Sequence, residues 1–395
     1  MEALFNEWLW QERYWLPPGI GWKDTEMKED EGHFPLPRDL ICTLPLALVF
    51  IVLRFVFERI IAIPLSRFLG VKDRIQIQVS PVPELEAFYK YKSRRPSKSE
   101  VVGLVKQCDL TERKIQTWFK NRRNQDRPSK TKKFCEESWK FAFYLIAFTA
   151  GLSSLINTSW LWDQKECWRG YPKQPVSDTH YWYYMLEMGF YLSLILTFSR
   201  DVKRKDSKWQ LMHHITTVFL IAFSYCANYV RVGLLVMLLH DSSDYILELA
   251  KMFHYAVWKR TSESLFVVFA VVFLVTRLVV LPCRLIHTTL LVSMEFYQPF
   301  FGYYFFNALL LVLQVLHIIW GRDIVRMAFK FLFSGKIEGD ERSDTESEDD
   351  EEGEGGDAED EENRMNSKLT PLANDSVLNN LTNQRSVNNR LPKAR

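Results

Sequence analysis

Residues 232–251 read Val-Gly-Leu-Leu-Val-Met-Leu-Leu-His-Asp-Ser-Ser-Asp-Tyr-Ile-Leu-Glu-Leu-Ala-Lys, an apolar stretch broken by the string His240-Asp241-Ser242-Ser243-Asp244. A second string, His213-His214-Ile215-Thr216-Thr217, interrupts the apolar stretch before it. An ionisable side chain near the centre of a bilayer costs about 2.5 to 3.5 kcal/mol on insertion scales. Such residues inside a membrane segment therefore predict a functional site. Imidazoles beside carboxylates are typical of proton transfer or nucleophilic chemistry.

The apolar stretches around these strings predict an all-α protein, a polytopic membrane helix bundle. Each has about the 17 to 25 residues that a spanning helix needs. The predicted spans are residues 40–63, 139–155, 181–198, 210–230, 232–250, 264–285 and 301–331. We therefore expect about seven spans, with six as the alternative.

The charge distribution orients these spans. The chain has 395 residues and a net charge of only +2, yet residues 338–362 hold sixteen acidic residues against one basic residue. Basic residues gather in short loops on the cytosolic side of membranes. With seven spans, the basic segments 201–206 and 259–260 fall on one side, which places the N-terminus in the lumen and the C-terminus in the cytosol. The six cysteines form no Cys-x-x-Cys pair, which argues against a disulfide framework and a zinc module.

The two ends of the chain carry further predictions. Residues 1–38 form a lumenal aromatic arm, residues 39–64 the first span, and residues 333–395 a disordered acidic tail. In that tail Ser343, Thr345 and Ser347 each precede an acidic residue by three positions, the pattern of an acidophilic kinase. Asn157-Thr158-Ser159 is a glycosylation sequon at a lumenal boundary.

The depths of the two polar strings predict that they meet. His213 lies about 8 Å from the cytosolic end of its span at Lys208, and His240 about 16 Å from the end of the next span at Lys251, at 1.5 Å per residue. Both then fall in the cytosolic half of the bilayer. His240, Asp244, Glu248 and Lys251 follow helical spacing on one face, which should point into the bundle.

Metal binding is the rival chemistry, because histidine and aspartate are metal ligands. Membrane di-iron hydroxylases, however, need many histidines in clustered boxes. The remaining histidines here are dispersed along the chain, at His33, His180, His254, His287 and His317. We therefore expect neither a metal site nor a cofactor.

Several strings together resemble the ceramide synthases. They are Asp201-Val-Lys-Arg-Lys-Asp206, His213-His214, Asn228-Tyr-Val-Arg231-Val-Gly233, His240-Asp-Ser-Ser-Asp244, Thr276-Arg277-Leu278, Phe301-Gly-Tyr-Tyr-Phe-Phe-Asn307 and Arg342-Ser-Asp-Thr-Glu346. The resemblance implies a TLC (TRAM-LAG1-CLN8) domain over residues 131–332. It also implies transfer of a fatty acyl group from acyl-CoA, as substrate, to the amine of a sphingoid base in the endoplasmic reticulum membrane. The likeness is nearest to vertebrate members that use long or very-long acyl chains.

This resemblance gives roles to the polar strings. Lys203, Arg204 and Lys205 would bind the phosphates of acyl-CoA. His213 or His214 would attack the thioester or deprotonate the amine, and His240 with Asp241 and Asp244 would relay the proton. Asn228, Arg231 and Arg277 would contact substrate. The resemblance is compatible with a homodimer and with a heterodimer formed with a related synthase.

The resemblance also points to one loop as a determinant of acyl length. This loop joins the last two predicted spans and would close the lumenal end of the acyl site. Its residues are Leu290, Leu291, Val292, Ser293, Met294, Glu295, Phe296, Tyr297, Gln298, Pro299 and Phe300.

Residues 71–128 resemble a homeodomain and predict a small three-helix cytosolic insert. The resemblance rests on Leu85, Phe88, Leu104 and the run Ile115-Gln-Thr-Trp118-Phe119-Lys-Asn121-Arg-Arg123. Asn121 aligns with the asparagine that reads adenine in homeodomains. The residues before Leu85 lack the arginine-rich arm that enters the minor groove, so we expect no sequence-specific DNA binding. A DNA-binding regulator and a non-catalytic, lipid-sensing membrane protein are the alternative functions.

Overall fold

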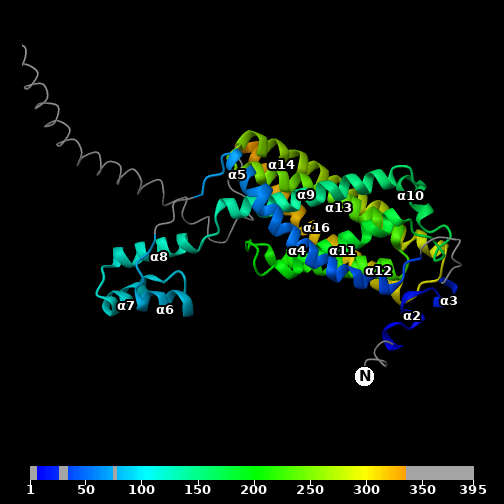
Figure 1. The fold of residues 1–395 in the computed structure, drawn as a ribbon, viewed down its shortest axis with the longest axis horizontal. Helices are drawn as coiled ribbons and strands as arrows, with labels where there is room; N and C mark the ends of the chain where they lie inside the picture. Colours follow the sequence, from blue (N-terminus) through cyan, green and yellow to red (C-terminus); the bar gives the residue numbers. More distant parts are fainter. Residues whose placement is uncertain (1–6, 26–33, 74–77, 335–395) are drawn as a thin grey trace, which may run out of the picture. The chain divides into compact units, whose positions relative to one another are not determined.

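The computed structural model describes residues 7–25, 34–73 and 78–334. Within these ranges the chain forms helices joined by loops, and no β-strand is present there. The long helices run side by side as a bundle (Figure 1). The predicted all-α class is confirmed.

Each predicted span coincides with a helical segment. The first is a nearly continuous rod of η1 (Pro37–Cys42), α4 (Thr43–Phe57), η2 (Glu58–Ala62) and α5 (Ile63–Phe68). The others are α9 (Lys130–Leu155), α11 (Asp178–Thr197), α12 (Ser207–Cys226), α13 (Val230–Tyr255), α14 (Lys259–Phe273) continued by the π-helical η4 (Leu274–Ile286), and α16 (Phe301–Ser334). The short elements are α2 (Glu12–Trp15), α3 (Trp22–Thr25), α10 (Ser159–Trp162), η3 (Gln164–Cys167), α15 (His287–Leu290) and η5 (Val292–Glu295).

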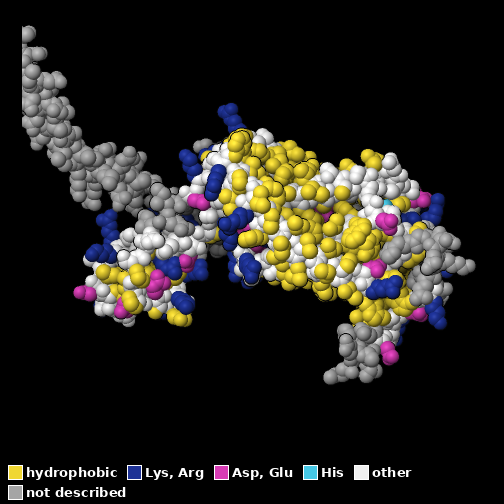
Figure 2. Space-filling view, viewed as in Figure 1, with side chains coloured by type: hydrophobic (Ala, Val, Ile, Leu, Met, Phe, Trp, Pro, Cys, Tyr) yellow, Lys and Arg dark blue, Asp and Glu magenta, His cyan; other side chains and the backbone are white. Residues whose placement is uncertain are grey.

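Part of the bundle surface is apolar. Three stretches, Pro37–Phe68, Lys259–Glu295 and Phe301–Phe333, are long and apolar enough to cross a membrane. Large apolar side chains are exposed along them, for example Leu48 on α4 and Val271 on α14. Figure 2 shows this apolar surface along the bundle, with lysine and arginine gathered towards its ends. A patch of this size is typical of a lipid-facing surface, and the protein is a membrane protein.

Helices α9, α11, α12 and α13 are more polar than the three apolar stretches. Their polar side chains are largely buried, as with Glu187 on α11 and His240 on α13. A helix that faces the bundle interior can carry such residues without exposing them to lipid. The count of about seven spans stays a prediction.

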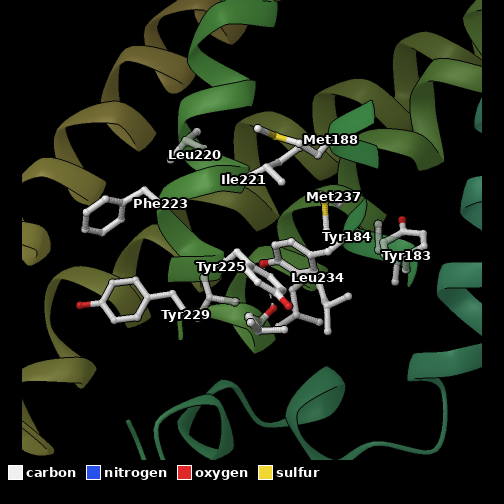
Figure 3. Packing of buried hydrophobic residues seen from close by; sticks show 14 of the residues in the cluster. Tyr183, Tyr184, Met188, Leu220, Ile221, Phe223, Tyr225, Tyr229, Leu234 and Met237 are labelled. Carbon is white, nitrogen blue, oxygen red and sulfur yellow. Dashed lines mark hydrogen bonds between the residues drawn. The ribbon is translucent and has the colours of Figure 1, made fainter. Parts of the chain in front are cut away.

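The core lies where α11, α12 and α13 meet (Figure 3). Tyr184 of α11 lies 5.6 Å, ring to ring, from Tyr225 of α12, and its hydroxyl pairs with Ser224 at 3.1 Å. Gly233 of α13 has no room for a side chain, since a Cβ there would lie 1.6 Å from the Tyr184 hydroxyl. These contacts hold α12 and α13, which carry the polar strings, in register.

The homeodomain-like segment forms the predicted three helices, α6 (Pro83–Tyr91), α7 (Lys98–Cys108) and α8 (Glu112–Asp126). A separate apolar core joins them, made of Leu85, Tyr89, Val101, Leu104, Ile115, Trp118 and Phe119. Helix α7 begins with a complete capping box, in which Ser97 and Glu100 satisfy each other's backbone N–H groups. A core and a helix cap of its own are what an independent small domain requires.

Some predictions lie outside the described residues. These are the disordered tail and its phosphorylation sites at Ser343, Thr345 and Ser347. The described part of the aromatic arm packs on the bundle, where Trp15 stacks on Phe223 with 5.0 Å between ring centroids. Tyr14 contacts Phe301 edge to face in the same region.

Candidate active site

The two polar strings meet inside the bundle. His213 and His214 lie on α12 and His240 lies on α13, and all three are buried. The rings of His213 and His240 are 6.3 Å apart, and those of His213 and His214 are 5.7 Å apart. The two polar strings therefore meet, as the depths of their residues predict.

A fourth histidine joins them. The prediction that His317 is one of the dispersed histidines is wrong, because on α16 its Nε2 lies 3.2 Å from the Nε2 of His240. It is fully buried, and its ring is 6.2 Å from that of His213. We call His213, His214, His240 and His317 the histidine layer.

Hydrogen bonding fixes the ring forms of two members of this layer. The Nδ1 of His240 lies 2.6 Å from the carbonyl oxygen of Val236, which only accepts, so Nδ1 carries the proton. In a neutral His240 the Nε2 then accepts, and the Nε2–H of His317 donates to it. This leaves Nδ1 of His317 as an acceptor. The Nδ1 atoms of His213, His214 and His317 are buried and have no hydrogen-bond partner within the described part of the chain. The Nδ1 of His317 is therefore available to accept a proton. His213 and His214 in their neutral forms each also have one unprotonated nitrogen, which can accept a proton or attack an acyl group.

Charged and polar side chains surround the layer. The Arg277 guanidinium, from η4, donates to the Asp244 carboxylate and, at 3.0 Å, to the His240 carbonyl oxygen. The Tyr183 hydroxyl donates to Asp241 at 2.9 Å. Of the predicted substrate contacts, Arg277 thus lies at the site, where its hydrogen bonds hold the middle of α13.

Two cavities reach the histidine layer. The apolar cavity lies among α11, α12, α13 and α16 and reaches His240. The polar cavity reaches His214 and is lined by Lys140, Lys203 and Arg204 among others. Tyr191 lines the apolar cavity, and its ring lies 5.7 Å from that of His214. The histidines therefore stand where a polar and an apolar compartment approach each other.

A network of buried charges shapes the polar cavity. Glu137 of α9 is fully buried and accepts from Arg204 and, at 3.2 Å, from Lys251. Arg204 is therefore anchored to the bundle. Lys203 is exposed and lines the cavity, whereas Lys205 is exposed and does not line it.

Two predicted substrate contacts lie away from the histidine layer. Asn228 donates to the carbonyl oxygens of Pro172 and Gln174. Arg231 donates to the Glu166 carbonyl oxygen at 2.8 Å. Along α13, Arg231 lies about 13 Å from His240 at a rise of 1.5 Å per residue. Both side chains hold the loop that precedes α11.

The loop of residues 290–300 lines neither of these cavities. It lies behind an aromatic layer at the far end of the apolar cavity. The Tyr297 hydroxyl pairs with that of Tyr229 at 2.6 Å, and Tyr229 contacts the cavity residue Phe306 at 5.1 Å between ring centroids. The loop thus meets the cavity through Tyr229 and Phe306.

The remaining observations concern the predicted glycosylation site and the possibility of a metal site. Asn157 is exposed in the turn between α9 and α10. Among the residues that the structure describes, no group of three or more histidine, cysteine or acidic side chains is arranged to hold a metal ion.

Comparison with known proteins assigns the family. The model of the TLC domain matches residues 133–326, and that of the homeodomain matches residues 71–128. The chain is 49% identical to ceramide synthase 4 of Homo sapiens over 350 residues, which is 88% of each protein. It is 46% identical to ceramide synthase 3 of Homo sapiens, over 87% of this chain and 88% of the relative. Ceramide synthase hyl-1 of Caenorhabditis elegans is 32% identical, over 86% of this chain and 84% of the relative. The chain belongs to the ceramide synthase family.

Proposed function

We propose that this chain is a ceramide synthase that transfers a long or very-long fatty acyl group from acyl-CoA to the amine of sphinganine or sphingosine, giving (dihydro)ceramide. The observation that carries the proposal is the histidine layer between a polar and an apolar cavity. An acyl-CoA has a matching division, with a charged nucleotide at one end and a hydrocarbon chain at the other. Its thioester would then lie at the imidazoles.

In this arrangement the CoA moiety enters through the polar cavity. Its phosphates are attracted to Lys203, Arg204 and Lys205, because phosphates favour cationic donors. Arg204 already pairs with Glu137, so Lys203, which lines the cavity, is the more available cation. The acyl chain extends into the apolar cavity, towards Phe306 and the aromatic layer in front of residues 290–300.

The histidine layer then performs the transfer. An unprotonated nitrogen of His213 or His214 attacks the thioester carbonyl carbon, the carbon–sulfur bond breaks, and CoA leaves as the thiol after taking up a proton. The amine attacks the acyl-imidazole, an amide bond forms, and the imidazole is released. The alternative is direct attack by an amine that His213 or His214 deprotonates. In both, His240 with His317, Asp241 and Asp244 carries the proton.

The proposal includes a location and an orientation. The protein resides in the endoplasmic reticulum membrane, with the N-terminus in the lumen and the C-terminus in the cytosol. An exposed Asn157 at the opposite end of α9 from the basic segment 130–133 supports this orientation. Conversion of Asn157 to glutamine should remove any endoglycosidase-sensitive mass shift without affecting synthesis.

The decisive experiment uses microsomes from cells whose own sphingoid N-acylation has been deleted. Microsomes with this chain, given sphinganine and a ladder of acyl-CoAs, should form dihydroceramide from the long and very-long members. The same chain with His213→Ala and His214→Ala should be at least about 100-fold slower, since acid–base groups contribute about 10² to 10⁴. Absence of N-acylation with every acyl-CoA would refute the proposal and favour a non-catalytic, lipid-sensing protein.

Two partners and the role of one segment are also proposed. An acidophilic kinase would phosphorylate the tail at Ser343, Thr345 and Ser347, and replacing these three residues by alanine should abolish incorporation of radiolabelled phosphate. Homodimers or heterodimers with related synthases would be detected by co-purification of differently tagged chains.

The homeodomain-like segment is proposed as a structural module without sequence-specific DNA binding. Selection of one duplex sequence from a random pool by residues 71–128 would contradict that assignment and support the DNA-binding alternative.

A further inference from the structure

One carboxyl group of the bundle has no role in the mechanism above. Glu187 of α11 is 1% exposed and lines the apolar cavity, whose other lining residues are mainly aliphatic and aromatic. In the described part of the chain, no hydroxyl, amide or cationic group donates a hydrogen bond to either of its carboxyl oxygens. Buried polar atoms nearly always have such a donor, so a carboxyl that lacks one and faces a cavity marks a position for a ligand.

A second carboxyl lies beside it. Asp241 of α13 is within hydrogen-bonding reach of Glu187, and one of its oxygens accepts from Tyr183 at 2.9 Å. Removing two neighbouring acidic groups from water is costly unless a cation or further donors compensate them. Within the described residues the nearby cations are engaged elsewhere: Arg277 pairs with Asp244, and Lys140 lines the polar cavity. The two carboxyls therefore have no cationic partner in the described part of the chain, and on their own they are compatible only as a pair that shares a proton. A bound cation can take the place of that shared proton.

The surroundings define which cation fits. The walls next to Glu187 are apolar, as with Leu220, Met237 and Leu313, so they accept a hydrocarbon chain rather than a hydrated ion. The same cavity reaches His240, at the histidine layer. A cation bound here is thus an alkylammonium whose nitrogen lies next to the reacting groups.

We propose that Glu187, paired with Asp241, binds the protonated amine of the sphingoid base and takes up its proton before acyl transfer. This inference rests on the proposed function, since it names the group that recognises the second substrate. In the step, one N–H bond of the ammonium breaks and its proton moves to the Glu187 carboxylate. The freed lone pair attacks the acyl carbon, the bond from that carbon to imidazole breaks, and its electrons return to the ring. The second proton of the amine leaves through His240.

The first test needs no substitution. Two inhibitors that cannot form an amide are compared on the full-length protein: N,N-dimethylsphinganine, which is cationic, and the octadecane triol that has a hydroxyl in place of the amine. Charge-assisted hydrogen bonds are about 1.5 to 3 kcal/mol in net strength, so the cationic analogue should inhibit at roughly 10- to 100-fold lower concentration. Equal inhibition by the two compounds would overturn the proposal.

The second test assigns the preference to Glu187. In Glu187→Gln the advantage of the cationic analogue should fall to less than about 3-fold, and the KM for sphinganine should rise by about 10-fold or more. Glu187→Asp should keep part of the preference. The matched control is Thr217→Val, an uncharged change in the same cavity, which should leave the ratio of the two inhibitors unchanged.

The outcomes separate this proposal from the proposed function. Release of CoA from acyl-CoA without sphinganine should persist in Glu187→Gln, which also shows that the variant is folded. If the unaltered chain N-acylates sphinganine and Glu187→Gln keeps the full preference for the cationic analogue, the Glu187 proposal fails and the proposed function stands. If the unaltered chain forms no amide with any acyl-CoA, the proposed function itself fails. Should Glu187→Gln not fold, the inhibitor ratios of the unaltered chain and of Glu187→Asp decide.

Discussion

The ion pair of Arg277 and Asp244 joins η4 to α13 at the histidine layer, and breaking it should destabilise the bundle. The side chains are 3% and 16% exposed, and the guanidinium also donates to the His240 carbonyl oxygen at 3.0 Å. In Arg277→Met the Asp244 carboxylate is left buried without its cation. Removing one partner of a buried pair costs about 3 to 5 kcal/mol.

The assay is thermal unfolding of the detergent-solubilised protein. A shift of about 2 °C per kcal/mol, the low end for larger domains, predicts that Arg277→Met lowers the Tm by roughly 6 °C or more. The matched control is Arg322→Met on α16. Arg322 pairs with Asp323, and the two side chains are 67% and 24% exposed, respectively. Exposed pairs are typically worth about 0 to 1 kcal/mol, so the control should shift the Tm by no more than about 2 °C.

The double variant Arg277→Met with Asp244→Asn separates stability from chemistry. Removing both charges eliminates the uncompensated carboxylate, so the Tm should recover relative to Arg277→Met alone. Activity should not recover, because Asp244 is part of the proposed proton relay. If Arg277→Met lowers the Tm no more than Arg322→Met does, the pair does not hold α13, and the reasoning is refuted.

Three further predictions concern other parts of the chain. His317→Gln should lower kcat by about 10² or more with little change in either KM. The glutamine amide can still donate to Nε2 of His240, but it cannot take up and release a proton as the His317 ring does; an unchanged kcat would exclude His317 from the mechanism. Gly233→Ala should destabilise the protein by about 1 to 3 kcal/mol, seen as a lower Tm, because a Cβ would lie 1.6 Å from the Tyr184 hydroxyl; a Tm equal to that of the unaltered chain would mean that α11 and α13 separate easily. Ser97→Ala in a fragment of residues 71–128 should cost about 1 kcal/mol in urea unfolding, as expected for a lost helix cap. In the intact fragment, hydrogen bonds from Ser97 lower the pKa of Glu100 below its ordinary 4.5, so the stability from this contact is present above that pH and lost as the pH falls through the lowered value. A fragment whose stability does not depend on Ser97 or on acid would contradict the role of the capping box.

Much of the architecture could be predicted because hydrophobic length and pattern determine it. The span-length apolar segments coincide with helices, and the apolar positions of residues 71–128 form the core of three helices. Helical rise, together with the orientation from basic residues, predicts that His213 and His240 lie in the same half of the bilayer, and their rings are 6.3 Å apart. The capping box of Ser97 and Glu100 is also a local pattern, visible in the sequence, yet it was not predicted.

Single polar residues in apolar helices were not predicted as site residues from the sequence. His317 and Glu187 each stand alone within a predicted span, 77 and 54 residues from His240 and Asp241 respectively. Their partners are set by how α11, α13 and α16 pack, which no local spacing encodes. A signal was present, because the energetic argument that selects the two strings applies equally to a lone ionisable residue in a span. Likewise, the hydrogen bonds of Asn228 and Arg231 to backbone carbonyl oxygens depend on the path of the loop of residues 163–177.

The central claim is that the acyl group passes through the histidine layer. The most direct measurement is the intact mass of the purified chain after incubation with acyl-CoA and no sphingoid base. The account predicts a mass increase equal to one acyl group, located by fragmentation on His213 or His214 and discharged when sphinganine is added. A chain that N-acylates sphinganine but never carries an acyl group would contradict covalent transfer by these histidines.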